Sequence, residues 1–370
     1  MTTKIVSIIS RMNVGGPAVL LAELISELPF QEFSHTLITG VCENNEVDFL
    51  LNNPLDSEVI YLSSMRRSLF LSSEIRSFYQ LVKVLRTISP DIVHTHTSKA
   101  GVLGRLAAHL ATPNAKIVHT YHGHLLYGYF SKWKVLLLIA IEKALAKLTD
   151  VLVSVSNQVV KDLNNVGVGR KCRWLVIHPG IRIADSPRII NKGLFTISWI
   201  GRFTEIKDPF LAVRVFAFLK KNFGDDFRFI MLGNGDLWDE AKELARNLEV
   251  TIEFPGWVSP VDAILEESNL LLMTSLNEGV PVVIIEAAGY GVPTMTTDVG
   301  GVKEFVRDQE TGFLVERGEA EIGNYICQLI SNKDLLSIVS LNARSLAMSE
   351  FSNRNYLQAH LDLYRFLKSH

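Results

Sequence analysis

The chain is predicted to be an α/β protein with two domains, each built on a parallel β-sheet that helices cover on both faces. Short apolar runs typical of buried strands alternate with helical patterns along the whole chain. One irregular polar stretch, residues 182–193, divides this alternation into two series. A chain of 370 residues is too long to fold around one ordinary hydrophobic core. Its hydrophobic content of 48% is sufficient for two such cores. Two Rossmann-like domains of similar size are therefore expected.

The first series lies in the amino-terminal half of the chain. Its strands are expected at residues 5–9, 35–39, 59–62, 92–96, 117–121 and 151–155. Helices are expected at residues 17–28, 74–88, 99–110 and 132–148. Because each helix connects two strands, neighbouring strands are expected to run parallel.

The second series begins after the polar stretch. Its strands are expected at residues 195–200, 227–232, 251–254, 269–274 and 294–296. A last helix at 353–367 carries Leu357, Leu361 and Tyr364 on one apolar stripe. The predicted domains span residues 1–182 and 193–350, followed by a helical segment at 351–370.

The composition excludes several classes of protein. A net charge of −2 gives no general attraction to nucleic acid. The three cysteines match no zinc-ligand spacing and fit a reducing compartment, so a cytoplasmic location is expected. No run of 18 apolar residues could form a membrane span, and the amino terminus is interpreted as a first strand and not a signal peptide.

Residues 277–293 form the most informative segment. Glu278 is expected on the loop after a buried strand, and Glu286 about two turns into the helix that Pro281 opens. A helix amino terminus binds anions such as phosphates, and a carboxylate beside it accepts hydrogen bonds from sugar hydroxyls. The segment therefore suits a nucleotide-sugar, although by itself it also fits a helix cap with a solvated glutamate.

Loops after other predicted strands carry further candidates. Arg202 and Lys207 lie on one loop at the carboxyl end of a strand, where they could clamp a diphosphate or remain solvated cations. Gly15 and Gly16 open a helix without the GxGxxG spacing of nicotinamide-dependent enzymes. Asn234 lies on a helix-start loop.

Five histidines lie in two loops at residues 94–96 and 119–124. They raise the hypothesis of a metal site, but no nearby Cys or Asp completes a ligand motif. Contacts with sugar hydroxyls or phosphates, or structural hydrogen bonds, are the alternatives. His122, directly before Gly123, is the histidine expected at the ligand site.

The ordered set of motifs resembles the family 4 retaining glycosyltransferases, over nearly the whole chain. The motifs are Gly201-Arg202…Lys207, Gly256-Trp257-Val258 and Glu278…Glu286, together with NVGGP at 13–17, HTHTSKAG at 94–101 and HTYHGH at 119–124. The resemblance implies a GT-B fold: two Rossmann-like domains facing a cleft, with the carboxy-terminal helix crossing back to the first domain. It implies an acceptor on domain 1–182, a nucleotide-sugar donor in domain 193–350, and no metal or cofactor.

The resemblance also implies roles for individual residues. Arg202 and Lys207 would hold the donor diphosphate, Glu278 would lie near the donor sugar, and His122 would contact the transferred sugar. The residues implied in donor binding are Gly15, Gly16, Asn234, Trp257, Val258, Gly279, Val280 and Glu286. Of these, Glu286 would accept from the ribose hydroxyls, and Trp257 and Val258 would flank the base. One departure from the family is Arg182, where many members have Asp, and it affects the hinge more than the chemistry.

The expected chemistry follows from charge. Breaking a sugar–phosphate bond places negative charge on the leaving diphosphate, and two fixed cations in a dry site stabilise it without a metal. Retention of configuration is implied by the resemblance alone. A uridine-diphosphate sugar is the expected donor because it is the commonest in related proteins.

Three other functions remain to be distinguished. A nucleotide-sugar 2-epimerase has the same fold and ligand, but the loop with Arg202 and Lys207 ahead of the paired glutamates favours a transferase. A non-catalytic nucleotide-sugar binder would not hydrolyse or transfer the donor. A nicotinamide-dependent dehydrogenase is disfavoured because the glycine fingerprint is missing.

Two stretches of the first domain, residues 65–71 and 125–134, are both basic and apolar. Aromatic rings and long cationic side chains suit the headgroup region of a bilayer, although an ordinary helix with solvated lysines also fits. We therefore expect a cytoplasmic enzyme that docks on the inner leaflet and acts on a lipid-linked saccharide.

Overall fold

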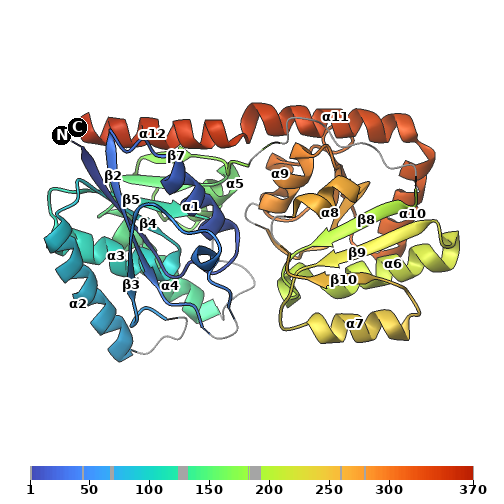
Figure 1. The fold of residues 1–370 in the computed structure, drawn as a ribbon, viewed down its shortest axis with the longest axis horizontal. Coiled ribbons are helices and arrows are strands. Elements are labelled where there is room, and N and C mark those ends of the chain that lie inside the picture. The colour runs from blue at the N-terminus through green and yellow to red at the C-terminus, as the bar shows by residue number, and fades with distance from the viewer. Residues whose placement is uncertain are drawn as a thin grey trace. The chain divides into compact units, whose positions relative to one another are not determined.

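The computed structural model contains two compact units, each with its own parallel sheet (Figure 1). Unit 1 comprises Met1–Gly180 and Arg354–His370, and unit 2 comprises Ile181–Asn353. The structure describes residues 2–43, 46–66, 71–123, 132–181, 183, 193–258, 261–278 and 281–369. The prediction of an α/β protein with two parallel, Rossmann-like sheets is confirmed.

Unit 1 has a seven-stranded sheet in the order β3-β2-β1-β4-β5-β6-β7. The strands are β1 (Thr3–Ile9), β2 (Phe33–Gly40), β3 (Glu58–Leu62), β4 (Ile92–His96), β5 (Lys116–Tyr121), β6 (Val151–Ser154) and β7 (Trp174–Val176). All neighbouring pairs are parallel. Strand β7 was not predicted, because three half-buried residues at a sheet edge produce no recognisable pattern.

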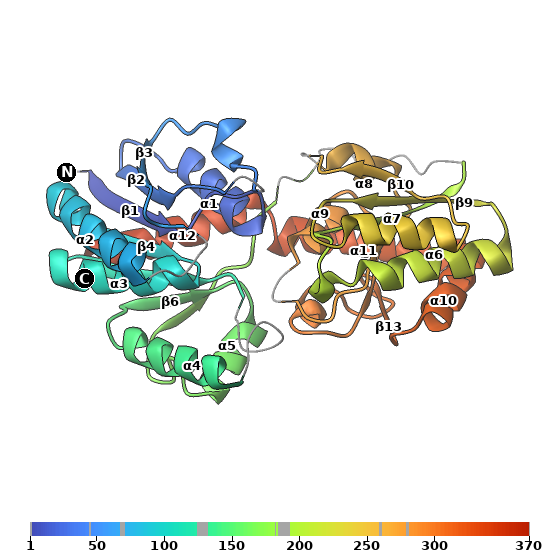
Figure 2. The ribbon, with the colours of Figure 1, turned by 90° about the horizontal axis from the view of Figure 1, so that it is seen from below.

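Helices cover both faces of this sheet. They are α1 (Gly16–Glu27), α2 (Leu71–Ile88), α3 (Ser98–Ala111), α4 (Lys132–Ala146), α5 (Asn157–Asn165) and α12 (Asn353–Ser369), with a 3₁₀ turn at Phe49–Leu51. Helices α2 and α3, side by side in Figure 2, share one apolar core with the sheet, and α1 packs into a second core. Helix α3 approaches closely because Gly104 has no Cβ, which would lie 2.7 Å from Thr95 Cγ2.

Unit 2 has a six-stranded sheet in the order β10-β9-β8-β11-β12-β13. The strands are β8 (Phe195–Ile200), β9 (Phe227–Leu232), β10 (Glu253–Gly256), β11 (Leu270–Met273), β12 (Thr294–Thr297) and β13 (Phe313–Val315). Its pairs are also parallel, so the carboxyl ends of the strands lie along one edge. The three-residue strand β13 was not predicted.

The helices of unit 2 again cover both faces. They are α6 (Pro209–Phe223), α7 (Trp238–Asn247), α8 (Asp262–Glu267), α9 (Val282–Gly289), α10 (Glu319–Ser331) and α11 (Lys333–Glu350), with 3₁₀ turns at Glu205–Lys207 and Val302–Glu304. The largest core joins α6, α7 and α10 to the sheet, while α8 and α9 share a smaller core and α9 also packs into a third. No helix among the described residues is both long and apolar enough to cross a bilayer.

The last helix, α12, belongs to unit 1 from Arg354 onward, so the predicted return of the carboxy-terminal helix is confirmed. Tyr364 Oη lies 2.7 Å from His94 Nδ1, and Tyr356 Oη donates to the carbonyl of Leu20. Arg365 makes a two-point ion pair with Glu32 at 3.0 and 2.7 Å. Buried rings and a surface ion pair thus attach α12 to the first domain.

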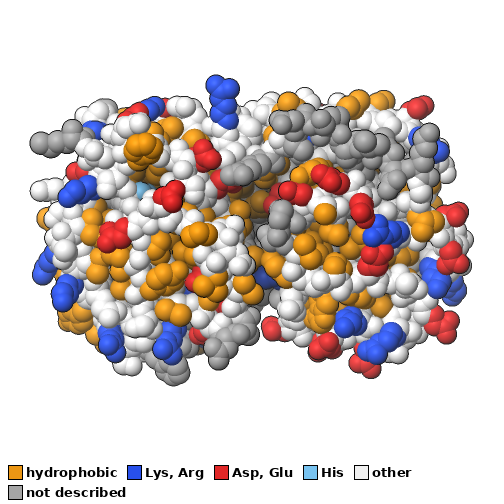
Figure 3. All heavy atoms as spheres, viewed as in Figure 1, with side chains coloured by type: hydrophobic (Ala, Val, Ile, Leu, Met, Phe, Trp, Pro, Cys, Tyr) orange, Lys and Arg blue, Asp and Glu red, His pale blue; other side chains and the backbone are white. Residues whose placement is uncertain are grey.

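Charge is divided unequally between the units. Unit 1 carries 21 Lys and Arg against 14 Asp and Glu, a formal charge of +7, whereas unit 2 carries 16 against 25, a charge of −9. On the face drawn in Figure 3, cationic side chains line the lower left edge, over the part of unit 1 where Figure 1 draws α2. The excess of positive charge is therefore confined to unit 1.

All ten histidines also belong to unit 1, and several are buried. Burial lowers the pKa of His360 from 6.5 to about 4 and that of His35 to about 3. Burial likewise lowers the pKa of His94, His96 and His119 well below 6.5. These rings are therefore neutral in the folded protein at neutral pH.

We predict that mild acid destabilises unit 1 selectively. Below pH 6.5 the unfolded chain binds protons that the folded chain does not, so stability falls as the pH drops toward the folded-state values. A residue such as His360 lowers the free energy of unfolding by roughly 2 kcal/mol between pH 7 and pH 5. Native-state hydrogen exchange at both pH values should show protection lost in unit 1 and retained in unit 2. Equal losses in both units would contradict this account.

Candidate active site

Glu278 lies at the carboxyl end of β11 and is only 9% exposed. Its Oε1 atom pairs with Lys207 Nζ and accepts a hydrogen bond from Ser275 Oγ at 2.5 Å. Thr297 Oγ1, at the end of β12, donates to the carbonyl of Ser275 at 3.1 Å. A buried carboxylate is thus fixed by a cation and a hydroxyl, and one of its oxygens carries both contacts.

Lys207 ends the 3₁₀ turn that follows β8. The hydroxyl of Thr274 lies 3.1 Å from the carbonyl oxygen of Lys207 and 2.8 Å from that of Asp208. Trp199 Nε1 in turn donates to the same hydroxyl at 3.0 Å. An ammonium group has three N–H donors, so Lys207 can hold Glu278 and still donate to an anionic ligand.

Arg202 lies on the same loop, directly after β8. Its side chain is exposed, and no described residue pairs with it. The loop itself is fixed, because Phe203 N donates to the carbonyl of Asn234 at 3.0 Å. The guanidinium is therefore available to a ligand, on a backbone that the neighbouring loop holds.

Glu286 is the fifth residue of α9, slightly more than one turn into the helix and not the predicted two. Its side chain is half-buried. Pro281 caps the helix with extended backbone, and the amino terminus of α9 thus lies just after Glu278. Gly279 and Val280, which were expected to offer backbone N–H groups to the donor, lie outside the described residues.

The loop after β12 packs directly against Glu278. Gly301 N donates to the carbonyl of Glu278 at 3.0 Å. Gly300 has a φ of 55°, and a Cβ there would lie 1.9 Å from the same carbonyl oxygen. Only glycine satisfies both the conformation and the contact, so this loop and the Glu278 loop form one unit of structure.

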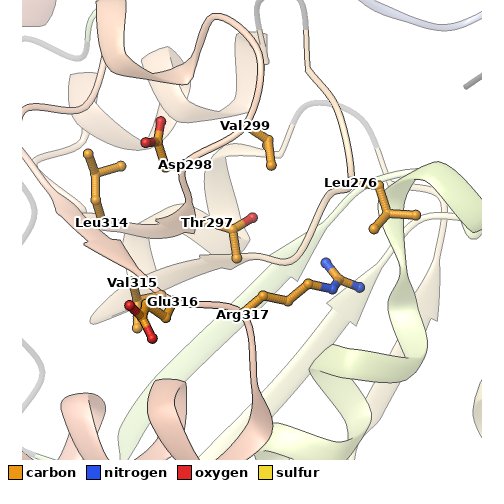
Figure 4. A pocket seen from close by; sticks show the side chains of 8 residues that line it. All are labelled: Leu276, Thr297, Asp298, Val299, Leu314, Val315, Glu316 and Arg317. Carbon is orange, nitrogen blue, oxygen red and sulfur yellow. The ribbon is translucent and has the colours of Figure 1, made fainter. Parts of the chain in front are cut away.

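A pocket of about 530 Å³ lies beside these loops, as Figure 4 shows. Its lining residues lie at or just after the ends of β11, β12 and β13: Leu276, Thr297, Asp298, Val299, Leu314, Val315, Glu316 and Arg317. Arg317 Nη1 donates to the carbonyl of Thr274 at 3.0 Å, and Nη2 pairs with Asp208 Oδ2. The pocket thus shares Arg317 with the turn that carries Lys207.

Trp257 and Val258 follow β10 and are 41% and 38% exposed. They therefore offer an apolar surface at the same edge of the sheet as the charged residues. Across the described part of unit 2, the sheet places Arg202, Lys207, Glu278 and Trp257 after β8, β11 and β10. An apolar surface at the same strand edge as paired charges suits a base linked to a diphosphate.

In unit 1, His122 follows β5 and its Nε2 lies 3.1 Å from His96 Nδ1. Burial lowers the pKa of His122 to about 4, so its ring is neutral at physiological pH. His94 and His119 are core residues that hydrogen-bond Thr120 and Thr95 at 2.6 and 2.9 Å. The described residues contain no group of three potential metal ligands, although His124 lies outside them.

Gly15 and Gly16 lie where β1 leads into α1, as the sequence predicted. Gly15 caps α1 with extended backbone, no side chain caps the helix, and Pro17 occupies its first turn. The first N–H groups of α1 are therefore satisfied by no side chain, which suits an anionic ligand.

Comparison with known proteins identifies the family. The model described as "Glycosyltransferase Family 4" matches residues 14–185, and "Glycosyl transferases group 1" matches residues 183–346. The chain is a family 4 glycosyltransferase. The predicted resemblance and the enzyme class are confirmed.

Individual relatives agree with this assignment. The UDP-Gal:alpha-D-GlcNAc-diphosphoundecaprenol alpha-1,3-galactosyltransferase of Escherichia coli is 28% identical over 91% of this chain and 90% of its own. The capsular polysaccharide biosynthesis glycosyltransferase CapM of Staphylococcus aureus is 24% identical over 81% and 83%. Anabaena HepE, solved with UDP-glucose, superimposes with a TM-score of 0.81 at 18% identity, over 99% and 100% of the two chains, and thus shares the GT-B fold.

The sequence missed three residues that organise the site of this transferase. Thr274 and Ser275 end the β11 run, and their role as hydrogen-bond donors to Lys207, Asp208 and Glu278 depends on tertiary contacts. Arg317 follows β13, and the rule that ligand residues follow strands would have found it had that short strand been recognised.

We predict that Arg202→Ala and Lys207→Ala each lower turnover about 100-fold or more, because each removes a cation placed for the leaving diphosphate. The measurement is initial rate at saturating donor, with thermal unfolding to show that folding is intact. Lys221→Ala and Arg246→Ala, exposed cations on α6 and α7, are the matched controls and should retain the wild-type rate. Near-normal rates in both Arg202→Ala and Lys207→Ala would refute the assignment.

Proposed function

We propose that the enzyme transfers a hexosyl or N-acetylhexosaminyl group, with retention of configuration, from a uridine-diphosphate sugar to a lipid-linked saccharide in the synthesis of a cell-surface polysaccharide or glycolipid. The observation that carries this proposal is the fixed Lys207–Glu278 pair, with Arg202, which pairs with no described residue, on the same loop as Lys207. It supplies cations for a diphosphate and a carboxylate for sugar hydroxyls at one edge of the sheet. The name of the E. coli relative, which states a UDP-sugar donor and a diphosphoundecaprenol acceptor, supports the choice of substrates.

The roles of the individual residues follow from chemistry. Arg202 and the remaining N–H groups of Lys207 stabilise the charge that develops on the diphosphate as the sugar–phosphate bond breaks. Glu278 accepts from hydroxyls of the donor sugar, Glu286 from those of the ribose, and Trp257 packs on the base. His122, neutral at physiological pH, hydrogen-bonds the transferred sugar without adding charge.

The test is analysis of products from a panel of nucleotide sugars, chosen first by thermal shift. A donor at 100 times its dissociation constant stabilises the protein by about 2.7 kcal/mol. We expect two products: a nucleoside diphosphate, and a lipid acceptor that carries the sugar with its anomeric configuration retained. An altered nucleotide sugar formed without acceptor would identify an epimerase, and binding without turnover would identify a binding protein.

We further propose that turnover needs no metal, since Arg202 and Lys207 supply the positive charge at the leaving group. Activity should therefore be unchanged by a chelator such as EDTA at millimolar concentration. A control with added Mg²⁺ or Mn²⁺ should show no stimulation. Loss of activity on chelation, with recovery on addition of a single divalent ion, would overturn this part of the proposal.

A lipid-linked acceptor requires access to a bilayer, and the basic helical face of unit 1 fits this partner. We define it as the exposed residues of α2, α3 and α4, together with Lys147 directly after α4. Its apolar members include Trp133 (64% exposed), Leu136 and Leu137 on α4, and Ile75 and Tyr79 on α2. Exposed cations accompany these apolar residues, with Lys143 on α4 and Lys147 directly after its end.

The charges of this face are of one sign. Its exposed cations are Arg76, Lys83, Arg86, Lys134, Lys143 and Lys147. Among the described residues of the three helices, the carboxylates Glu74 and Glu142 are both neutralised, by Lys99 at 2.5 Å and by Arg105 at 2.8 Å. Net positive charge next to exposed aromatic and aliphatic side chains favours an anionic membrane surface. Of the two predicted stretches, residues 67–70 and 125–131 lie outside the described residues.

We predict that the protein sediments with vesicles containing anionic lipid, and less so as salt rises. Each well-placed cation contributes about 1 kcal/mol, so Lys83→Glu/Arg86→Glu and Arg66→Ala/Arg67→Ala should both weaken binding at least tenfold. Trp133→Ser tests the apolar contribution. Lys221→Glu/Arg246→Glu in unit 2 is the matched charge control and should bind normally. Absence of vesicle binding, with full activity on a water-soluble acceptor, would indicate a soluble glycan or small-molecule acceptor.

A further inference from the structure

Arg317 lines the pocket of unit 2 and also contacts the turn that presents Lys207. It follows β13, whereas the turn follows β8 and Thr274 follows β11. Its guanidinium donates to the carbonyl of Thr274 at 3.0 Å and pairs with the carboxylate of Asp208. One planar side chain therefore joins the ends of three strands.

The residue that Arg317 holds, Asp208, is strained. Its φ of 42° and ψ of 68° place a non-glycine residue in the left-handed region, which is costly for residues with a side chain. Its Oδ1 atom caps α6 by accepting from Leu211 N at 3.1 Å, and its Oδ2 atom meets Arg317. A strained residue keeps such a conformation only where several contacts determine it.

Lys207 directly precedes this strained residue. Thr274 holds the carbonyls of Lys207 and Asp208 from one side, and Arg317 holds the Asp208 side chain from the other. The backbone of Lys207 is thus determined by contacts that do not involve its own ammonium group. The backbone fixes the point from which the Lys207 side chain starts, and its ammonium reaches Glu278.

We propose that Arg317 is a positioning residue that sets the orientation of Lys207 through Asp208 and Thr274. This inference rests on the proposed function, in which Lys207 acts on the leaving diphosphate. In this proposal Arg317 acts through the turn and not on a reacting atom. Its removal deprives the turn of the contacts with Asp208 Oδ2 and the Thr274 carbonyl, and a displacement of about 1 Å at a catalytic group can reduce the rate 100-fold.

The test is a double-mutant cycle on turnover with saturating nucleotide sugar. Arg317→Ala alone should lower kcat about 10- to 100-fold, and less than about 3-fold in a Lys207→Ala background, because the group that it positions is already gone. Arg317→Lys, which keeps the charge near Asp208 but not the two-point contact, should recover part of the loss. Arg307→Ala, which removes an exposed arginine paired with Glu310 in the same unit, is the matched control and should retain the wild-type rate.

A second variant tests the same contact in case Arg317→Ala does not fold. Asp208→Asn removes the charge that faces Arg317 while keeping a good helix cap for α6. It should lower kcat in the same direction and add little to the effect of Arg317→Ala. Independent, multiplicative losses in Arg317→Ala and Lys207→Ala would overturn the proposal. If Lys207→Ala turned over at the wild-type rate, the proposed role of Lys207 at the diphosphate would be refuted, and the positioning role of Arg317 would be refuted with it.

Discussion

The site of unit 2 depends on one interaction, the ion pair between Lys207 and Glu278. It joins the loop after β8 to the loop after β11 and fixes a cation and a carboxylate side by side. Each partner has its own support: Thr274 holds the backbone of Lys207, and Ser275 holds the carboxylate of Glu278. Since adjacent residues at the end of β11 provide both supports, the two charges form a single structural element. Electrostatic catalysis requires charges that are fixed before the reaction begins.

The parallel sheet explains why this element can exist. All six strands of unit 2 end along one edge, so residues more than 100 positions apart in the chain, such as Lys207 and Arg317, come together there. Each strand contributes one or two side chains, and the cores on both faces hold the strands in register. In unit 1 the carboxyl ends of the strands also bring side chains together, but these are neutral histidines. The positive charge of unit 1 lies on its helices instead.

Much of the fold could be predicted from the sequence, because buried parallel strands are continuous apolar runs separated by helices. The runs at 5–9 and 92–96 lie in β1 and β4, and the run at 269–274 contains β11, whereas the three-residue edge strands β7 and β13 gave no such signal. The candidate residues Lys207 and Glu278 were found because each follows a recognisable strand. The roles of Thr274, Ser275 and Arg317 could not be predicted, since they consist of hydrogen bonds between loops distant in sequence.

The central claim is that Lys207 stabilises the leaving diphosphate more in the transition state than in the bound donor. Parallel measurement of kcat and of the donor dissociation constant in Lys207→Ala tests it most directly, with Arg317→Lys as a variant that keeps the lysine. The account predicts that kcat falls about 100-fold or more while the dissociation constant changes less than about tenfold. A dissociation constant that rises as much as catalytic efficiency falls, with kcat unchanged, would show that Lys207 only binds the donor, and would contradict the account.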